Sequence, residues 1–90
     1  MVRMIARMND EPVRAGRASG DERSVRVGRL IEDAQLLRRI TQEEAADSLG
    51  WSLPTYVRTV KGLRPMSLLE LERAAVWLGM TTSELVERTN

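Results

Sequence analysis

The spacing of apolar residues predicts helices from about residue 24 to the end of the chain. Between residues 24 and 39, apolar side chains recur three or four positions apart, which is the spacing of one face of an α-helix. This first stripe consists of Val27, Leu30, Ile31, Ala34 and Leu37. No stretch of the sequence alternates in the way typical of a strand. The pattern therefore predicts an all-α fold whose first helix ends near Arg39.

Four further short helices are indicated by residues that begin and end helices. A Thr or Ser followed three positions later by Glu forms a capping box, in which the hydroxyl and the carboxylate satisfy free backbone N–H groups. Ser52 and Pro54 are typical of another helix start, and glycines 50, 62 and 79 suit helix ends. We therefore expect helices to begin near residues 42, 53, 68 and 82. The three capping boxes are Thr41 with Glu44, Ser67 with Glu70, and Thr81 with Glu84.

Each of these helices has apolar residues for one shared core. We expect a compact five-helix domain over residues 24–90, because short connections join the helices and no second core is visible. The expected inward residues are Ala45, Ala46 and Leu49 in the second helix, Tyr56 and Val60 in the third, Leu68, Leu71, Ala75 and Leu78 in the fourth, and Leu85 and Val86 in the fifth.

Residues 1–23 differ from the rest of the chain and are expected to form an N-terminal arm or linker. Residues 9–23 contain Pro12, Gly16, Ser19 and Gly20 among scattered charges, with Val13 as the one large aliphatic residue. Met1, Met4, Ile5 and Met8 have helical spacing, which predicts a short amphipathic helix over residues 1–8 that docks on an apolar surface. The alternatives are a frayed terminus and a basic arm along DNA, and acidic residues in the same stretch weaken the latter.

The composition excludes several classes of function. The chain has 90 residues, of which 42% are hydrophobic and 30% charged, as in one soluble globular domain. It has neither Cys nor His, which excludes disulfides, the usual zinc sites and nucleophiles activated by an imidazole. No apolar run approaches the roughly 18 residues of a membrane span. We expect a cytoplasmic protein of a bacterial cell or phage-infected bacterium that is not an enzyme and has no cofactor, metal or membrane partner.

The net charge of +1 is unevenly distributed. Residues 48–69 contain no Asp or Glu but include Arg58, Lys61 and Arg64. If Tyr56 and Val60 face the core, the opposite side of the third helix is exposed. The sequence therefore predicts an outer face that combines apolar and basic side chains. That face consists of Leu53, Pro54, Val57, Arg58 and Lys61.

The stretch from Thr41 to Gly62 predicts a short helix, a turn at Gly50 and a second helix. Ala46 permits a close helix crossing, and Gly50 can adopt a positive φ without strain. Over about residues 27–86, the chain resembles the lambda-repressor/Cro-like (XRE-type) helix-turn-helix family. The matching residues are Gly28, Thr41, Gln42, Glu43, Glu44, Ala46, Leu49, Gly50, Tyr56, Gly62, Pro65, Leu71, Ala75, Leu78, Gly79 and Leu85.

Two positions depart from the family's pattern. The family usually has an Arg in the first helix and a Glu near the end of the recognition helix, and the two form a buried ion pair. Here these positions hold Gln35 and Val60. Because both charges are absent together, neither side chain leaves a buried charge without a partner.

The resemblance implies a regulator of transcription that binds double-stranded DNA and reads the major groove with the helix around residues 53–61. It also implies a homodimer on a palindromic operator, with half-sites about 34–36 Å apart. The Gln42 side chain and the start of its helix are expected to contact phosphate, and Arg58 to contact guanine or phosphate. The candidate DNA-binding residues are Gln42, Ser52, Leu53, Pro54, Thr55, Val57, Arg58, Lys61 and Arg64.

The alternative to DNA binding is a function in binding another protein. Val76 and Trp77 give the fourth helix extra apolar surface, and an exposed Trp is typical of a partner interface. The chain would then be an antitoxin or adaptor whose main partner is a protein. The candidate dimer or partner surface consists of Met4, Ile5, Met8, Val76 and Trp77.

Overall fold

The computed structural model describes residues 22–90, and within that range it contains five α-helices and no strand. The expected all-α fold is therefore confirmed for this part of the chain. The first helix already includes Glu22, two residues before the expected start. The helix predicted over residues 1–8, with Met4, Ile5 and Met8, lies outside the described residues. The helices are α1 (Glu22–Arg38), α2 (Gln42–Leu49), α3 (Leu53–Val60), α4 (Leu68–Leu78) and α5 (Thr82–Arg88).

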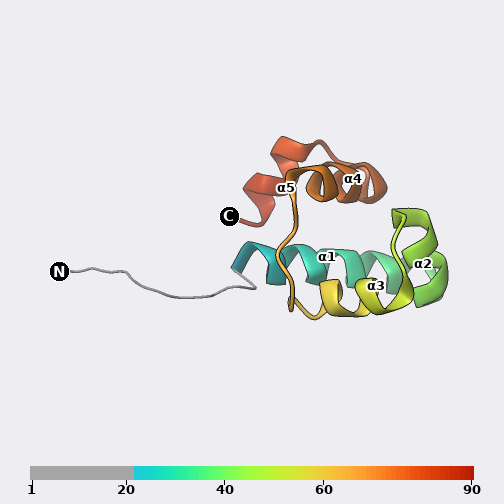
Figure 1. Cartoon of the computed structure of the whole chain (residues 1–90). Helices are drawn as coiled ribbons and strands as arrows, with labels where there is room; N and C mark the ends of the chain where they lie inside the picture. The colour runs from blue at the N-terminus through green and yellow to red at the C-terminus, as the bar shows by residue number, and fades with distance from the viewer. Residues whose placement is uncertain (1–21) are drawn as a thin grey trace.

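Helix α1 lies between the other helices (Figure 1). Helix α3 packs against one side of α1, and α4 packs against the other. Helix α2 stands at the end of α1 and touches both α3 and α4, while α5 packs on α4. This arrangement leaves the far side of α3 without another helix against it.

The local signals for helix ends are confirmed. All three predicted capping boxes are present, and the Ser52 side chain accepts a hydrogen bond at the start of α3. Gly50 and Gly79 end α2 and α4 in the left-handed conformation, with φ of 76° and 78°. Helix α1 ends differently, because Arg39 adopts a positive φ of 58° where a glycine is more usual.

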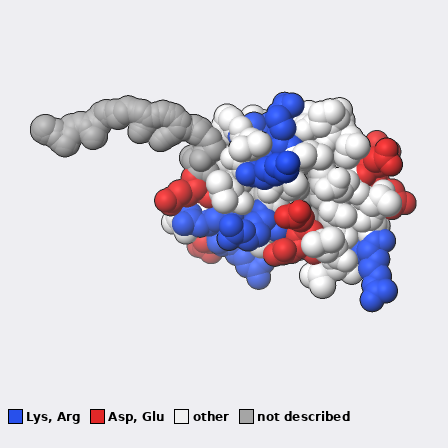
Figure 2. All heavy atoms as spheres, turned by 90° about the horizontal axis from the view of Figure 1, so that it is seen from below, with Lys and Arg blue, Asp and Glu red and all other residues white. Residues whose placement is uncertain are grey.

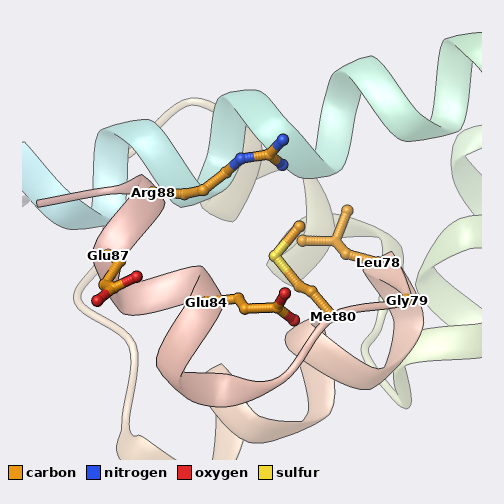
Figure 3. Close-up of a pocket in the computed structure, with 6 residues that line it drawn as sticks. All are labelled: Leu78, Gly79, Met80, Glu84, Glu87 and Arg88. Atoms are coloured by element: carbon orange, nitrogen blue, oxygen red, sulfur yellow. The ribbon is translucent and has the colours of Figure 1, made fainter.

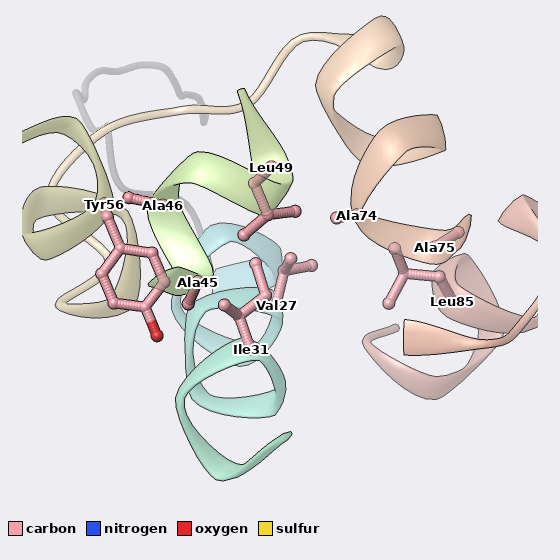
Figure 4. Close-up of a cluster of buried hydrophobic side chains, with 9 residues drawn as sticks. All are labelled: Val27, Ile31, Ala45, Ala46, Leu49, Tyr56, Ala74, Ala75 and Leu85. Carbon is pink, nitrogen blue, oxygen red and sulfur yellow. The ribbon is translucent and has the colours of Figure 1, made fainter. Parts of the chain in front are cut away.

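The core contains several alanines, which lets the helices approach closely (Figure 4). In Figure 4 the Tyr56 ring lies beside the two alanines of α2, and Leu85 reaches the core from α5. Partly buried residues such as Trp51 and Leu71 surround this cluster. The buried hydrophobic residues are Val27, Ile31, Ala45, Ala46, Leu49, Tyr56, Ala74, Ala75 and Leu85.

Two of the predicted inward positions, Leu37 and Leu68, are wrong. Leu37 is 83% exposed, because Gln35 rather than Leu37 turns inward at that end of α1. Leu68 is 66% exposed, since it lies in the first turn of α4, ahead of the buried pair of alanines. On α3, Val60 is half-buried and packs against the core as expected, but Thr59, which was not expected to face inward, is fully buried with Tyr56.

Candidate nucleic-acid interface

A three-residue turn closed by backbone hydrogen bonds joins α2 to α3. Helix α2 ends at Leu49 and α3 begins at Leu53. The Gly50 N–H donates to the Asp47 carbonyl oxygen at 3.1 Å, and the Trp51 N–H donates to that of Ala46 at 2.9 Å. These bonds satisfy the last carbonyls of α2 and set the direction in which the chain leaves it. The position of α3 relative to α2 is therefore well defined.

Helix α3 also lies unusually close to α1. A Cβ atom added to Gly28 would stand 2.3 Å from the backbone oxygen of Thr59 and 3.0 Å from the Cα of Val60. Only a residue without a side chain fits between these two backbones. Gly28 therefore sets the distance between α1 and the inner face of α3.

A buried hydrogen bond adds to this contact. The Tyr56 hydroxyl donates to Gln35 Oε1 at 3.0 Å, and Gln35 Nε2 donates to the Ile40 carbonyl oxygen at 2.8 Å. Gln35 thus joins α3 to the end of α1 without a buried charge. Burial raises the pKa of Tyr56 to about 12, and the negative charge of Glu32 acts in the same direction.

The outer face of α3 is apolar and basic, as predicted. Pro54, Arg58 and Lys61 are exposed, Leu53 is 37% exposed, and Val57 is half-buried. Neither Arg58 nor Lys61 has a side-chain hydrogen bond or ion pair to another described residue, and no acidic residue lies on α3. These two cations therefore remain available for an external anion.

The hydroxyl groups at the start of α3 are engaged with each other. The Ser52 hydroxyl donates to Thr55 Oγ1 at 3.0 Å and accepts from the Thr55 backbone N–H at 3.3 Å. Thr55 is half-buried. Gln42 is exposed at the first position of α2, as a phosphate contact requires, but Glu43 and Glu44 lie in the same turn.

The structure assigns Arg64 to contacts within the chain. Its Nε donates to Thr59 Oγ1 at 2.8 Å, its Nη1 lies 3.0 Å from Glu70 Oε2, and its guanidinium lies 5.2 Å from the centre of the Trp51 ring. Arg64 thus connects α3 to α4. Its charge is balanced by Glu70, which makes it a weaker candidate for a phosphate contact than Lys61.

These contacts also affect Glu70. Burial by itself would raise the pKa of its carboxyl group, but hydrogen bonds from the Ser67 backbone and from Arg64, together with the charge of Arg64, lower the pKa below 4.5. The sequence signal for this pair was the capping box, which identified Glu70 but not its partner Arg64.

Val76 and Trp77 behave differently from each other. Val76 is 79% exposed, whereas Trp77 is half-buried beneath the guanidinium of Arg38, which lies 4.3 Å from the ring centre. Arg38 Nη2 also donates to the Trp77 carbonyl oxygen at 2.8 Å. Both residues line a shallow, mostly apolar groove between α2 and α4, together with Ser48, Leu69, Glu72 and Arg73.

Another hollow lies beside α5, and its lining residues do not converge on one point (Figure 3). The Glu84 carboxylate caps its own helix, and Glu87 and Arg88 point in different directions. Over residues 22–90 there is no group of three or more Asp or Glu side chains placed to hold a metal ion. In the same part of the chain, no helix is both long enough and apolar enough to span a membrane.

Viewed from the α3 side, the surface carries separate basic groups among uncharged and acidic ones (Figure 2). It does not form one continuous basic area, in keeping with the net charge of +1. No protein-family model matches the sequence, and no curated protein shows significant similarity to it.

Proposed function

We propose that this chain is a sequence-specific regulator of transcription that binds double-stranded DNA and inserts α3 into the major groove. The observation that carries the proposal is the outer face of α3, which has no helix packed on it and holds two cations without partners in the described chain. The α2–turn–α3 geometry supports the resemblance to lambda-repressor/Cro-like helix-turn-helix proteins.

The charge distribution favours selective binding over general affinity for DNA. Non-specific binding depends on the number of phosphates that a protein neutralises, and the outer face of α3 supplies only Arg58 and Lys61 as cations without a partner in the described chain. Selectivity would then come from a few contacts to bases and from pairing of two copies. A homodimer would place two α3 helices on half-sites about 34–36 Å apart, as a palindromic operator requires.

The test is selection of bound duplexes from a random DNA library by the full chain at moderate salt. One enriched motif with two-fold symmetry is expected. Failure to enrich any motif would contradict the proposal. Sedimentation of the enriched duplex with the protein then measures how many copies are bound.

The antitoxin or adaptor function is the second candidate, and the groove between α2 and α4 favours it. Exposed Val76 and Leu69 line that groove on a side of the molecule away from α3. Val76→Asp in the full chain separates the functions. Loss of self-association together with operator affinity would make the groove a dimer interface, and unchanged operator binding would leave the groove free for another protein.

A further inference from the structure

The outer face of α3 offers few groups that can form hydrogen bonds with bases. Pro54 has no backbone N–H, and the Ser52 hydroxyl is engaged in the helix cap. Thr59 is buried, where its hydroxyl donates to the Thr55 carbonyl oxygen and accepts from Arg64. The exposed contact surface at the start of the helix therefore consists mainly of carbon, and Arg58 is the exposed polar side chain within α3.

This composition restricts what α3 can recognise in a major groove. Most base edges there present hydrogen-bond donors and acceptors, and an apolar side chain that covers them removes water without replacing its hydrogen bonds. The 5-methyl group of thymine is the exception, since contact with it buries apolar surface on both sides.

The spacing of the apolar side chains suits neighbouring pyrimidines. Leu53 and Val57 are four positions apart on one helix face, which corresponds to a rise of about 6 Å. Successive bases on one strand are about 3.4 Å apart, so two base steps cover a similar distance. Arg58, four positions after Pro54, lies on the Pro54 side of the same outer face, where its cation can hold a phosphate or a guanine.

Resting on the proposed DNA-binding function, we infer that α3 reads 5-methylpyrimidines through Leu53, Pro54 and Val57. The recognised chemical group is the methyl on C5 of the base. Thymine carries it in ordinary DNA, and 5-methylcytosine carries it at the same ring position. A 5-methylcytosine paired with guanine is therefore expected to restore part of the affinity that a thymine at the same position gives.

The experiment uses the full chain and the duplex obtained by selection. Each thymine is replaced in turn by deoxyuridine, which removes only the methyl group and preserves pairing. At one to three positions in each half-site, affinity is expected to fall about fourfold, the effect of losing one buried methyl. At those positions a C·G pair should bind more weakly than T·A, and 5-methylation of the cytosine should recover part of the loss.

Val57→Ala tests whether the side chain and the methyl group act together. For this variant, deoxyuridine at the matching position should cause little further loss. Val86→Ala is the matched control, because it makes the same change at another half-buried valine, on α5 rather than α3, and it should keep the wild-type sensitivity.

Two results overturn the inference. A selected duplex that binds equally well with deoxyuridine at every position shows that the methyl groups are not read, while DNA binding itself stands. Absence of any selected duplex removes both the inference and the proposed function.

Discussion

At the scale of single residues, two polar contacts tie α3 to its neighbours. Tyr56 bonds to Gln35 on α1, and Arg64, which follows α3, bonds to Glu70 on α4. Each contact includes a group whose pKa is shifted, so each gives stability a pH dependence of known sign.

Tyr56→Phe is expected to destabilise the fold by about 1–3 kcal/mol near neutral pH, because it leaves Gln35 Oε1 as a buried acceptor without a donor. The pKa of Tyr56 in the folded chain is about 12, above its ordinary value of 10.0, so folding favours the neutral phenol. That contribution is fully present below pH 10 and is lost as the pH rises through 12. Urea unfolding of wild type and variant from pH 9 to 12 is expected to show this loss in the wild type alone.

A direct check is available, because Tyr56 is the single tyrosine of the chain. The ultraviolet absorbance of tyrosinate therefore reports its titration without overlap from another tyrosine. Titration near pH 10 in the folded protein would contradict the buried hydrogen bond.

Glu70→Gln is expected to lower the stability of the fold at neutral pH and to make that stability less sensitive to a fall in pH. The folded pKa of Glu70 is lowered, so its contribution is present above pH 4.5 and is lost as the pH falls through the folded value. Glutamine can still accept from the Ser67 backbone, which isolates the loss of charge. Unfolding at neutral and acidic pH should show the variant and the wild type converging in acid.

Glu72→Gln is the matched control for this measurement. Glu72 lies on the same helix but is exposed and has no hydrogen bond or ion pair to another described residue. If Glu72→Gln lowered stability as much as Glu70→Gln does, the contact between Glu70 and Arg64 would not be the cause of the loss.

At the scale of helices, the close approach of α1 and α3 decides where the proposed recognition surface lies. Gly28 permits that approach, and the alanines of α2 lie beside the Tyr56 ring of α3 (Figure 4). The outer face of α3 therefore owes its position to small residues that lie on the inner side of that helix.

Gly28→Ala is expected to destabilise the fold by about 1–3 kcal/mol. In an exposed helix the same change adds up to about 1 kcal/mol of stability. Here the new Cβ would meet the backbone of α3 at Thr59, which cannot turn away as a flexible side chain can. Thermal unfolding measures the effect, and a more stable variant would contradict the close packing.

Gly79→Ala is a useful comparison for this prediction. No atom lies within 4 Å of the position of its Cβ, so its cost of about 1–2 kcal/mol should come from the positive φ alone. Only Gly28→Ala is expected to weaken operator binding in addition, since it displaces α3.

At the scale of the whole molecule, the proposed DNA binding would rest on few charges, because the net charge of the chain is only +1. Lys61→Ala is expected to weaken binding to all sequences and to reduce the salt slope by about one. Arg58→Ala should instead relax the preference at one base position. Binding isotherms at several salt concentrations, on the selected duplex and on an unrelated one, distinguish these effects.

Arg88→Ala is the control for the loss of one positive charge, because Arg88 is exposed on α5 and away from α3. Equal losses on both duplexes for Arg58→Ala would make Arg58 a phosphate contact. A change in salt slope for Arg88→Ala would move the DNA-contacting surface away from α3.

The sequence by itself determined where the helices begin and end. Capping boxes and terminal glycines act through hydrogen bonds that span three to five residues, so the residues that form them are close together in the sequence. For the same reason, the exposed face of α3 followed from helical spacing once Tyr56 was placed inward. Thr41, Ser67 and Thr81 therefore cap their helices as predicted, and Arg58 is exposed as predicted.

Only the tertiary structure decided which polar residues are buried and which leucines are exposed. Gln35 turns inward because it finds two hydrogen-bond partners there: Tyr56, which is distant in the sequence, and Ile40, which lies beyond the end of α1. Leu37 is left exposed. Arg64 pairs with Glu70 rather than facing outward, since the loop after α3 brings it against α4. Such contacts depend on how the helices pack against one another. The free energy of burying a polar side chain depends on its partners on other helices, and the spacing of residues along one helix does not identify those partners.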